Sequence, residues 1–247
     1  MDKIIRITLG LFVIILVAFA ASVLYTGYVD TAYRTSLSST YSYQCTVTTN
    51  DLLTNVTLFV PVPASPAGTS PVIDQISAHN ITSFPKDWNA VLFDTGKTTL
   101  LEIAAARIGQ PPVNGSAVTT TVTFAVNADS TSHVDTHSPM ADDAIFRPVQ
   151  NAKETDCPAG TGVANGLPNC VQYVTWVYAK YSAAPTTSVS IHASATGRNR
   201  WSVFHPEFNE YENTFDVTLS GSNSGWVIAP GWLENGIGSY DEPQVSR

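Results

Sequence analysis

Charged side chains are scarce in this sequence of 247 residues, in which Asp, Glu, Lys and Arg together make up only 13%. Cations are the scarcer class: 12 Lys and Arg stand against 20 Asp and Glu, which gives a net charge of −8 at pH 7. A surface with this charge repels phosphate-rich polymers and anionic lipid headgroups. We therefore exclude nucleic-acid binding and expect no nucleic acid among the partners.

Helical periodicity is missing after residue 40, and so is any recognisable catalytic signature. No Ser-His-Asp arrangement with a nucleophile elbow is visible. The tripeptide Asp94-Thr95-Gly96 matches the short aspartic-protease signature, but that chemistry requires two such carboxylates and the sequence holds one copy. Because strand-like residues flank the tripeptide on both sides, it predicts a hairpin turn. We predict that the protein is not an enzyme and carries no cofactor.

One long hydrophobic run is present, at residues 7–29, and the cations Lys3 and Arg6 precede it. About 20 helical residues cross the ~30 Å hydrocarbon core of a bilayer, so this run is long enough to span it. The two cations predict a cytoplasmic amino terminus. Aromatic side chains suited to the outer interface follow the run, namely Tyr25, Tyr28 and Tyr33. We predict a transmembrane signal anchor over residues 1–30 that contacts the lipid bilayer through residues 7–29.

A cleaved signal peptide is the alternative reading of this run, because Ala18-Phe19-Ala20 has the A-x-A pattern of a cleavage site. The apolar run continues past that point through Val23 and Leu24, which favours an anchor. With either reading, the rest of the chain lies outside the cytoplasm. We predict a single-pass protein of the cell membrane with its carboxy-terminal domain extracytoplasmic.

Only three cysteines are present. Cys157 and Cys170 bracket a Gly- and Pro-containing segment without apolar periodicity, so we predict that a disulfide closes this loop in an oxidising compartment. Cys45 lies in a segment whose odd positions carry the larger apolar groups, which predicts a buried free thiol; an intermolecular bridge is the alternative.

Nine segments rich in Val, Thr, Ile and aromatic residues alternate with Gly, Pro, Asn or Ser clusters, as is typical of strands and turns. They are residues 41–49, 55–62, 90–93, 99–105, 117–127, 171–181, 188–195, 211–219 and 225–228. Strands at this spacing predict a mainly β fold, a β-sandwich of immunoglobulin-like or jelly-roll-like type. We place a juxtamembrane connector at residues 31–40 and the sandwich ectodomain at residues 41–247.

A long irregular stretch at residues 129–156 contains His133, Asp135 and His137. In an extended segment, period-two alternation places these three side chains on one face, and two imidazoles with a carboxylate form a ligand set for Zn or Fe. The flanking residues are Ser and Thr rather than an apolar shell. We keep the three residues as a candidate metal site.

Three N-x-S/T sequons begin at Asn55, Asn80 and Asn114. In an extracytoplasmic domain they predict glycosylation where the cell has the machinery.

An amino-terminal hydrophobic helix that leads directly into an all-β domain resembles the organisation of archaeal pilins and archaellins. Those precursors have a basic residue just before the cleavage glycine, whereas Gly10 here follows Ile7-Thr8-Leu9. The strand at residues 55–63 is similar to those of single-pass envelope proteins of methanogenic archaea. These resemblances imply a protein of the archaeal cell envelope.

The leading functional hypothesis is therefore a membrane-anchored envelope protein that displays its β-sandwich as a structural or protein-interaction module, with protein partners or self-association. Two alternatives stay open. One is a filament subunit whose apolar helices pack together in a core. The other is a metal-binding extracytoplasmic enzyme or receptor on the same anchor.

Overall fold

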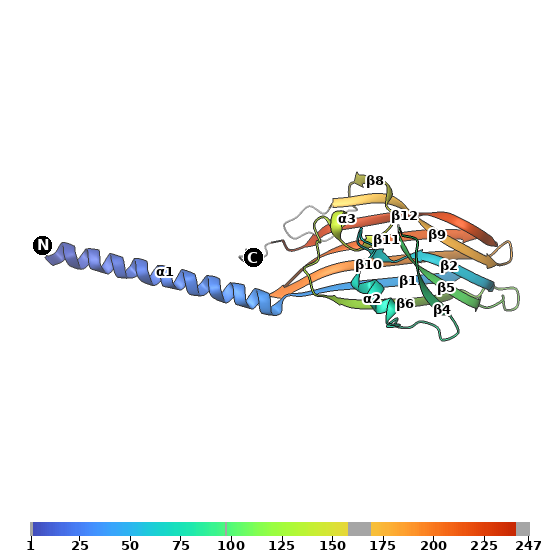
Figure 1. Cartoon of the computed structure of the whole chain (residues 1–247), viewed down its shortest axis with the longest axis horizontal. Coiled ribbons are helices and arrows are strands. Elements are labelled where there is room, and N and C mark those ends of the chain that lie inside the picture. Colours follow the sequence, from blue (N-terminus) through green and yellow to red (C-terminus); the bar gives the residue numbers. More distant parts are fainter. Residues whose placement is uncertain (1, 97, 158–168, 241–247) are drawn as a thin grey trace.

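The computed structural model describes residues 2–96, 98–157 and 169–240, and it shows a long helix that leads into one β domain (Figure 1). The helices are α1 (Asp2–Ser36), α2 (Pro71–Ser77) and α3 (Pro139–Asp142). The strands are β1 (Ser38–Thr49), β2 (Leu53–Pro61), β3 (Pro63–Ala64), β4 (Asn89–Asp94), β5 (Thr99–Ile108), β6 (Thr120–Ser130), β7 (Ile145–Phe146), β8 (Gln150–Thr155), β9 (Asn169–Ser182), β10 (Ser188–Ser202), β11 (Pro206–Ser220) and β12 (Asn223–Gly238). The predicted mainly β class with a preceding apolar helix is confirmed.

Helix α1 projects away from the domain, and its side chains are exposed from Lys3 to Tyr28. Its 35 residues correspond to a length of about 52 Å. Polar hydroxyls within it bond to the helix backbone, as Thr8 Oγ1 does to the Ile4 carbonyl at 3.0 Å, so they need no water. By length and composition the helix suits a membrane span, and a signal sequence would meet the same criteria.

The segment predicted as a connector, residues 31–40, has a different structure. Helix α1 continues to Ser36 and strand β1 begins at Ser38, so Leu37 alone separates them. The Leu37 N–H still donates to the Tyr33 carbonyl at 2.9 Å, which continues the helical bonding up to the strand.

Ten strands form one antiparallel sheet in the order β4-β5-β2-β9-β12-β11-β10-β1-β6, with β8 beside β9, while β3 and β7 pair separately. β11 and β12 are the strands that join its two halves, and they pair over only part of their length, from Asn209–Phe215 to Gly231–Gly238. Beyond that part, within the described residues, β11 pairs with β10 and β12 pairs with β9. The curled sheet therefore divides into two layers that face each other.

The two layers enclose the core as those of a sandwich do. One layer contains β4, β5, β2, β9 and β12, and the other contains β11, β10, β1 and β6. The architecture differs from an immunoglobulin-like or jelly-roll sandwich in one respect, because β11 and β12 unite both layers in a single hydrogen-bonded sheet.

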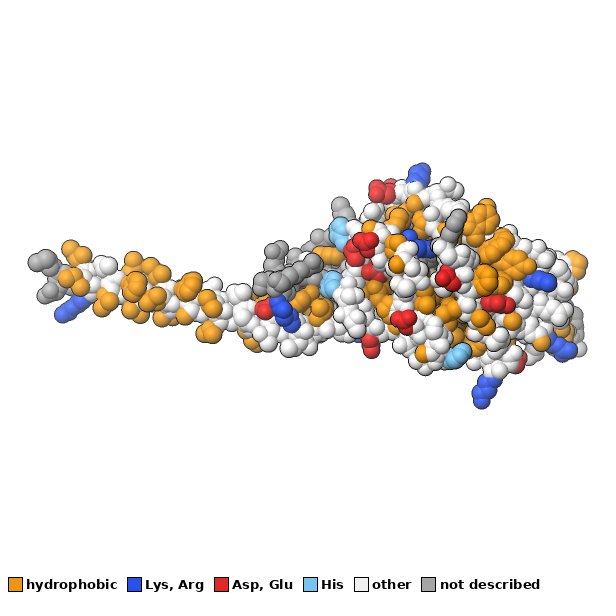
Figure 2. All heavy atoms as spheres, viewed as in Figure 1, with side chains coloured by type: hydrophobic (Ala, Val, Ile, Leu, Met, Phe, Trp, Pro, Cys, Tyr) orange, Lys and Arg blue, Asp and Glu red, His pale blue; other side chains and the backbone are white. Residues whose placement is uncertain are grey.

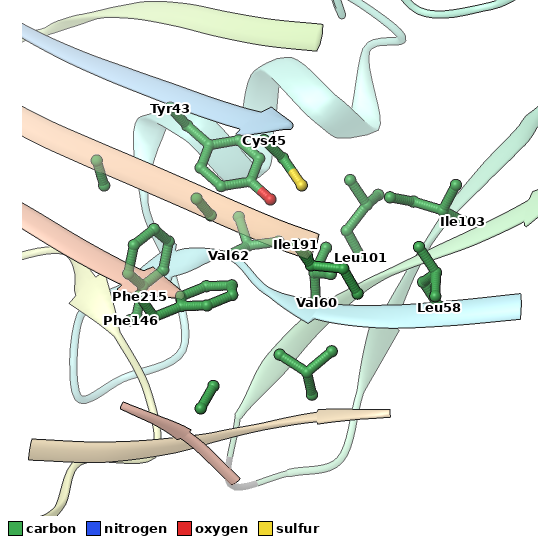
Figure 3. Packing of buried hydrophobic residues seen from close by; sticks show 14 of the residues in the cluster. Tyr43, Cys45, Leu58, Val60, Val62, Leu101, Ile103, Phe146, Ile191 and Phe215 are labelled. Atoms are coloured by element: carbon green, nitrogen blue, oxygen red, sulfur yellow. The ribbon is translucent and has the colours of Figure 1, made fainter. Parts of the chain in front are cut away.

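Alternating residues of each strand fill this core, as period two requires. In β10, for example, every second residue from Val189 to Trp201 is buried. Figure 3 shows side chains of both layers meeting, with Tyr43 and Ile191 on one side and Leu58 and Leu101 on the other. Phe146 contributes an edge-to-face contact with Phe215, at 4.9 Å between ring centroids.

Helix α2 lies between the two edge strands of the sheet, where it packs against β6 and β4. Ser70 caps it by accepting the Ile73 N–H, and Pro71 occupies its first turn, where a missing N–H costs nothing. Its buried residues Val72 and Ile76 join the core. The helix thus covers the opening that the two edge strands leave.

The predicted hairpin turn at Asp94-Thr95-Gly96 is confirmed. It connects β4 to β5, and Gly96 has the left-handed φ of 74° that this turn needs. The Asp94 carboxylate accepts the Gly96 N–H at 2.7 Å, which is a local structural role for this residue.

The cysteine predictions are also confirmed. Cys157 and Cys170 form a disulfide with a Cα–Cα distance of 5.3 Å, and it ties the start of β9 to the segment after β8. Cys45 is a free, fully buried thiol. Burial disfavours the thiolate and raises the pKa of Cys45 to about 12.

Replacing both Cys157 and Cys170 with Ser should lower the free energy of unfolding by about 3 kcal/mol, because the open chain gains the entropy that the closed loop lacks. Urea unfolding of the purified protein measures the difference. In the wild-type protein a thiol reagent at pH 8 should find no reactive thiol in the native state and one, Cys45, after denaturation. Three reactive thiols in denatured protein purified without reductant would contradict the pairing.

Candidate functional site

Residues 131–148 cross the end of the β domain and are held there by buried polar side chains. The segment follows β6 and contains α3 and β7, and its residues alternate between buried and exposed from His133 to His137. Such an irregular segment satisfies only some of its own backbone groups, so the other buried N–H and C=O groups need partners elsewhere. Asparagines of β10 and β11 supply several of these partners.

The three asparagines, Asn199, Asn209 and Asn213, are fully buried on the inner face of their strands. Asn199 accepts the Val134 N–H at 3.0 Å and donates to the Val134 carbonyl at 2.8 Å, so it bonds to the segment as a neighbouring strand would. Its side-chain N–H also reaches Asn209 Oδ1 at 2.8 Å, across a register pair of β10 and β11.

The other two asparagines extend this network. Asn209 Oδ1 accepts the Thr136 hydroxyl at 3.0 Å. Asn213 Oδ1 accepts the Phe146 N–H at 2.7 Å, and its amide donates to the Tyr173 hydroxyl at 2.8 Å. The asparagines therefore fix the segment at three points and leave few of their own polar atoms without a partner.

A second buried cluster surrounds Asp143 in the same segment. Its carboxylate accepts the Tyr41 hydroxyl at 2.5 Å and the Asp135 N–H at 2.7 Å. Burial, together with the hydrogen bond to this carboxylate, raises the pKa of Tyr41 well above its usual range, so the phenol stays protonated. The cluster holds the segment against β1.

Arg147 closes the segment, with its guanidinium donating to the Ala64 carbonyl at 2.9 Å and the Met140 carbonyl at 3.1 Å. Partial burial lowers its pKa, as desolvation disfavours the cation. Its bonds go to backbone oxygens, so Arg147 has a structural role.

The candidate metal ligands His133, Asp135 and His137 do share the exposed side of this segment, because Val134 and Thr136 between them are buried. Asp135 uses one carboxylate oxygen to accept the backbone N–H of His137 at 3.0 Å. Among the residues that the structure describes, no three His, Cys, Asp or Glu side chains gather closely enough to hold a metal ion. The predicted site is therefore not assembled in this structure.

The three sequon asparagines, Asn55, Asn80 and Asn114, are all exposed. Their position allows access to a glycosylating enzyme, and glycosylation stays a prediction.

A patch of large apolar side chains covers part of the outer surface of the β4-β5-β2-β9-β12 layer. We call it the aromatic face; its residues are Phe59, Val91, Phe93, Tyr178, Trp226 and Ile228. Figure 2 shows apolar side chains gathered in a broad area on one side of the domain.

The rings of the aromatic face come from β4, β2, β9 and β12 and contact one another. Phe59 meets Phe93 and Tyr178 with ring centroids 5.5 Å apart in both pairs, and Tyr178 meets Trp226 at 5.4 Å. Trp226 is nevertheless 53% exposed, and Ile228 is 55% exposed. Single exposed apolar residues are common on soluble proteins, whereas a contiguous group of this kind is a candidate interaction surface.

The junction between α1 and the domain is packed. Tyr33 and Trp201 are both buried, with their rings edge to face at 6.0 Å. Ser36 Oγ accepts the Ser202 N–H at 2.9 Å and lies 3.0 Å from the Ser202 carbonyl oxygen. These contacts join the last turn of the helix to the end of β10.

Sequence reasoning missed the asparagines and the junction. One of the asparagines could have been found from the sequence. Asn213 lies two residues from both Tyr211 and Phe215 in a predicted strand, so its side chain must point to the same, inward face. A polar residue at an inward position predicts a buried hydrogen-bonding role. The contact of Tyr33 with Trp201 joins residues far apart in the chain, and no local pattern indicates it.

Asn199→Ala should lower the free energy of unfolding by about 2 to 4 kcal/mol, because it leaves the buried Val134 N–H and C=O without partners. Hydrogen exchange should show lost protection in residues 131–148. Asn127→Ala, at an exposed position of β6, is the matched control and should change stability by no more than about 0.5 kcal/mol. Equal stability of the two variants would contradict the conclusion that Asn199 holds the segment at residues 131–148 in place.

In comparisons with protein-family models, curated proteins and solved structures, no match to the chain was found. A function for the chain therefore rests on its own residues, and chiefly on the junction and the aromatic face.

Proposed function

We propose that the protein is a single-pass protein of the cell membrane. It holds its β domain in a fixed position on the extracytoplasmic side of that membrane, as a structural or interaction module. The observation that carries this proposal is the packed junction, in which Tyr33 and Trp201 are buried against each other. If the anchor only had to keep the domain at the membrane, a flexible linker would be sufficient. Here one residue, Leu37, connects helix α1 to strand β1, so the direction of the helix sets the orientation of the domain.

The disulfide supports the location of the domain. Cys157 and Cys170 are bridged, and such bonds persist in oxidising compartments outside the cytoplasm. Lys3 and Arg6 lie before the apolar run, which favours a cytoplasmic amino terminus.

The module makes its contact through the aromatic face, and its partner is a second copy of the chain. The helix and the long strands run along the same long axis, so the outer face of each layer points sideways when the helix spans a membrane (Figure 1). Anchored copies share one orientation and one plane, which brings identical lateral faces together around a two-fold axis along the membrane normal. Burial of the exposed Trp226 and Phe93 supplies the driving force.

Labelling with a membrane-impermeant thiol reagent tests the topology. Thr186→Cys places a thiol on the exposed turn between β9 and β10, and Asp2→Cys places one before the span while Lys3 and Arg6 are kept. In intact cells the reagent should modify Thr186→Cys, and it should reach Asp2→Cys only after permeabilisation. Buried Cys45 provides the low background. Protection of Thr186→Cys in intact cells would overturn the proposal, and loss of the Asp2→Cys site from the mature protein would identify a cleaved signal peptide.

The oligomeric state in nanodiscs tests the aromatic face. The double variant Trp226→Ser with Phe93→Ser should raise the dissociation constant of the dimer at least about tenfold, because large buried aromatics dominate interface energies. Phe208→Ser, which removes a 38% exposed ring from the other layer, is the matched control and should leave the constant unchanged. Monomeric wild-type protein, or equal effects of the two changes, would contradict self-association through this face.

A further inference from the structure

The turn between β10 and β11, residues 203–205, lies at the end of the domain that faces helix α1. Its tip, Phe204, is 66% exposed although it is a large apolar side chain. Ser202, at the base of the turn, bonds to Ser36 at the end of α1. From that base the turn extends back along the helix, toward the part that precedes Ser36.

Phe204 contacts two tyrosines of α1 there, stacked on Tyr25 and tilted against Tyr28. Its ring centroid lies 6.1 Å from that of Tyr25, with the planes 16° apart, and 6.2 Å from that of Tyr28. The turn therefore reaches about two to three helical turns below the junction, since 8 to 11 residues separate these tyrosines from Ser36.

The position of the span sets the level of this contact relative to a bilayer. The apolar part begins at Ile7, directly after Arg6, so about 20 residues at 1.5 Å each cross the ~30 Å core and end near Thr26. Tyr25 and Tyr28 then lie at the boundary between the hydrocarbon core and the outer headgroups, which aromatic side chains favour.

We propose that Phe204 and the turn at residues 203–205 form a second membrane contact, in which the ring of Phe204 inserts at the boundary between headgroups and acyl chains beside α1. This inference rests on the proposed function, because it requires α1 to span the bilayer. The partner is the lipid surface itself, which accommodates an exposed apolar ring that water does not. The turn and the helix together hold the domain at two points, which fixes its tilt as well as its height.

Fluorescence quenching in phosphatidylcholine nanodiscs tests the contact with the full-length chain. Single cysteines are introduced as Phe204→Cys and, as a second position in the same turn, His205→Cys, whose side chain is 71% exposed. They are labelled with an environment-sensitive dye in the native state, where Cys45 is buried and Cys157 is bridged. Quenchers are lipids spin-labelled near the headgroup, lipids spin-labelled deep in the acyl chain, and soluble iodide.

Three reference positions give the scale. Leu16→Cys marks the middle of the span, Tyr28→Cys marks the interface, and Thr186→Cys marks an exposed turn between β9 and β10. Labels in the turn at residues 203–205 should match Tyr28→Cys, with blue-shifted emission and quenching by headgroup-labelled lipids. Thr186→Cys should respond to iodide alone.

The outcomes separate the two proposals. Lipid quenching at Leu16→Cys with only iodide quenching at positions 204 and 205 would overturn the second membrane contact and leave the span intact. No lipid quenching at Leu16→Cys would overturn the proposed function itself. Shielding of positions 204 and 205 from both lipid and iodide would also overturn the lipid contact, in favour of a protein surface such as a second copy.

Discussion

The junction between α1 and β1 is the constraint on which the arrangement of the molecule depends. Leu37 alone lies between helix α1 and strand β1, so there is no linker that would let the angle between them change freely. The aromatic pair of Tyr33 and Trp201 is buried at the same place, and such pairs contribute about 0.5 to 1.5 kcal/mol beyond their area. The Ser36 bond to Ser202 then ties the helix end to a second strand. The orientation of the whole β domain follows from these few contacts.

The buried asparagines provide hydrogen-bond partners for backbone groups at the same end of the domain. Where the curled sheet is a single layer, β11 and β12 pair with each other, and the segment at residues 131–148 closes the end over them. Asn199 and Asn213 satisfy backbone groups of that segment from inside the core. Unpaired, these groups would each cost about 1 to 3 kcal/mol, so a polar core position is favourable here. The segment that contains the candidate metal ligands thus closes one end of the domain, while the exposed aromatic face lies on the outer surface of one layer.

Period-two patterns predicted most of the strands, because most of them bury one face and expose the other. All nine predicted segments fall largely within observed strands, and the structure extends most of them. Strand β8 was missed because it is almost entirely exposed and shows no alternation, and α2 was missed because seven residues are too few for helical periodicity. The aromatic face and the junction depend on pairs such as Phe59 with Tyr178 and Tyr33 with Trp201, which only the register and the fold bring together.

The central claim is that helix and domain move as one body, and a distance measurement between spin labels tests it most directly. Labels at Leu16→Cys in α1 and Thr186→Cys on the far turn of the domain report the angle at Leu37 through pulsed electron resonance in nanodiscs. A packed junction predicts one narrow distance distribution, and Trp201→Ala, which removes the ring that Tyr33 packs against, should broaden it. A broad distribution in the wild-type chain, unchanged by that substitution, would contradict the account.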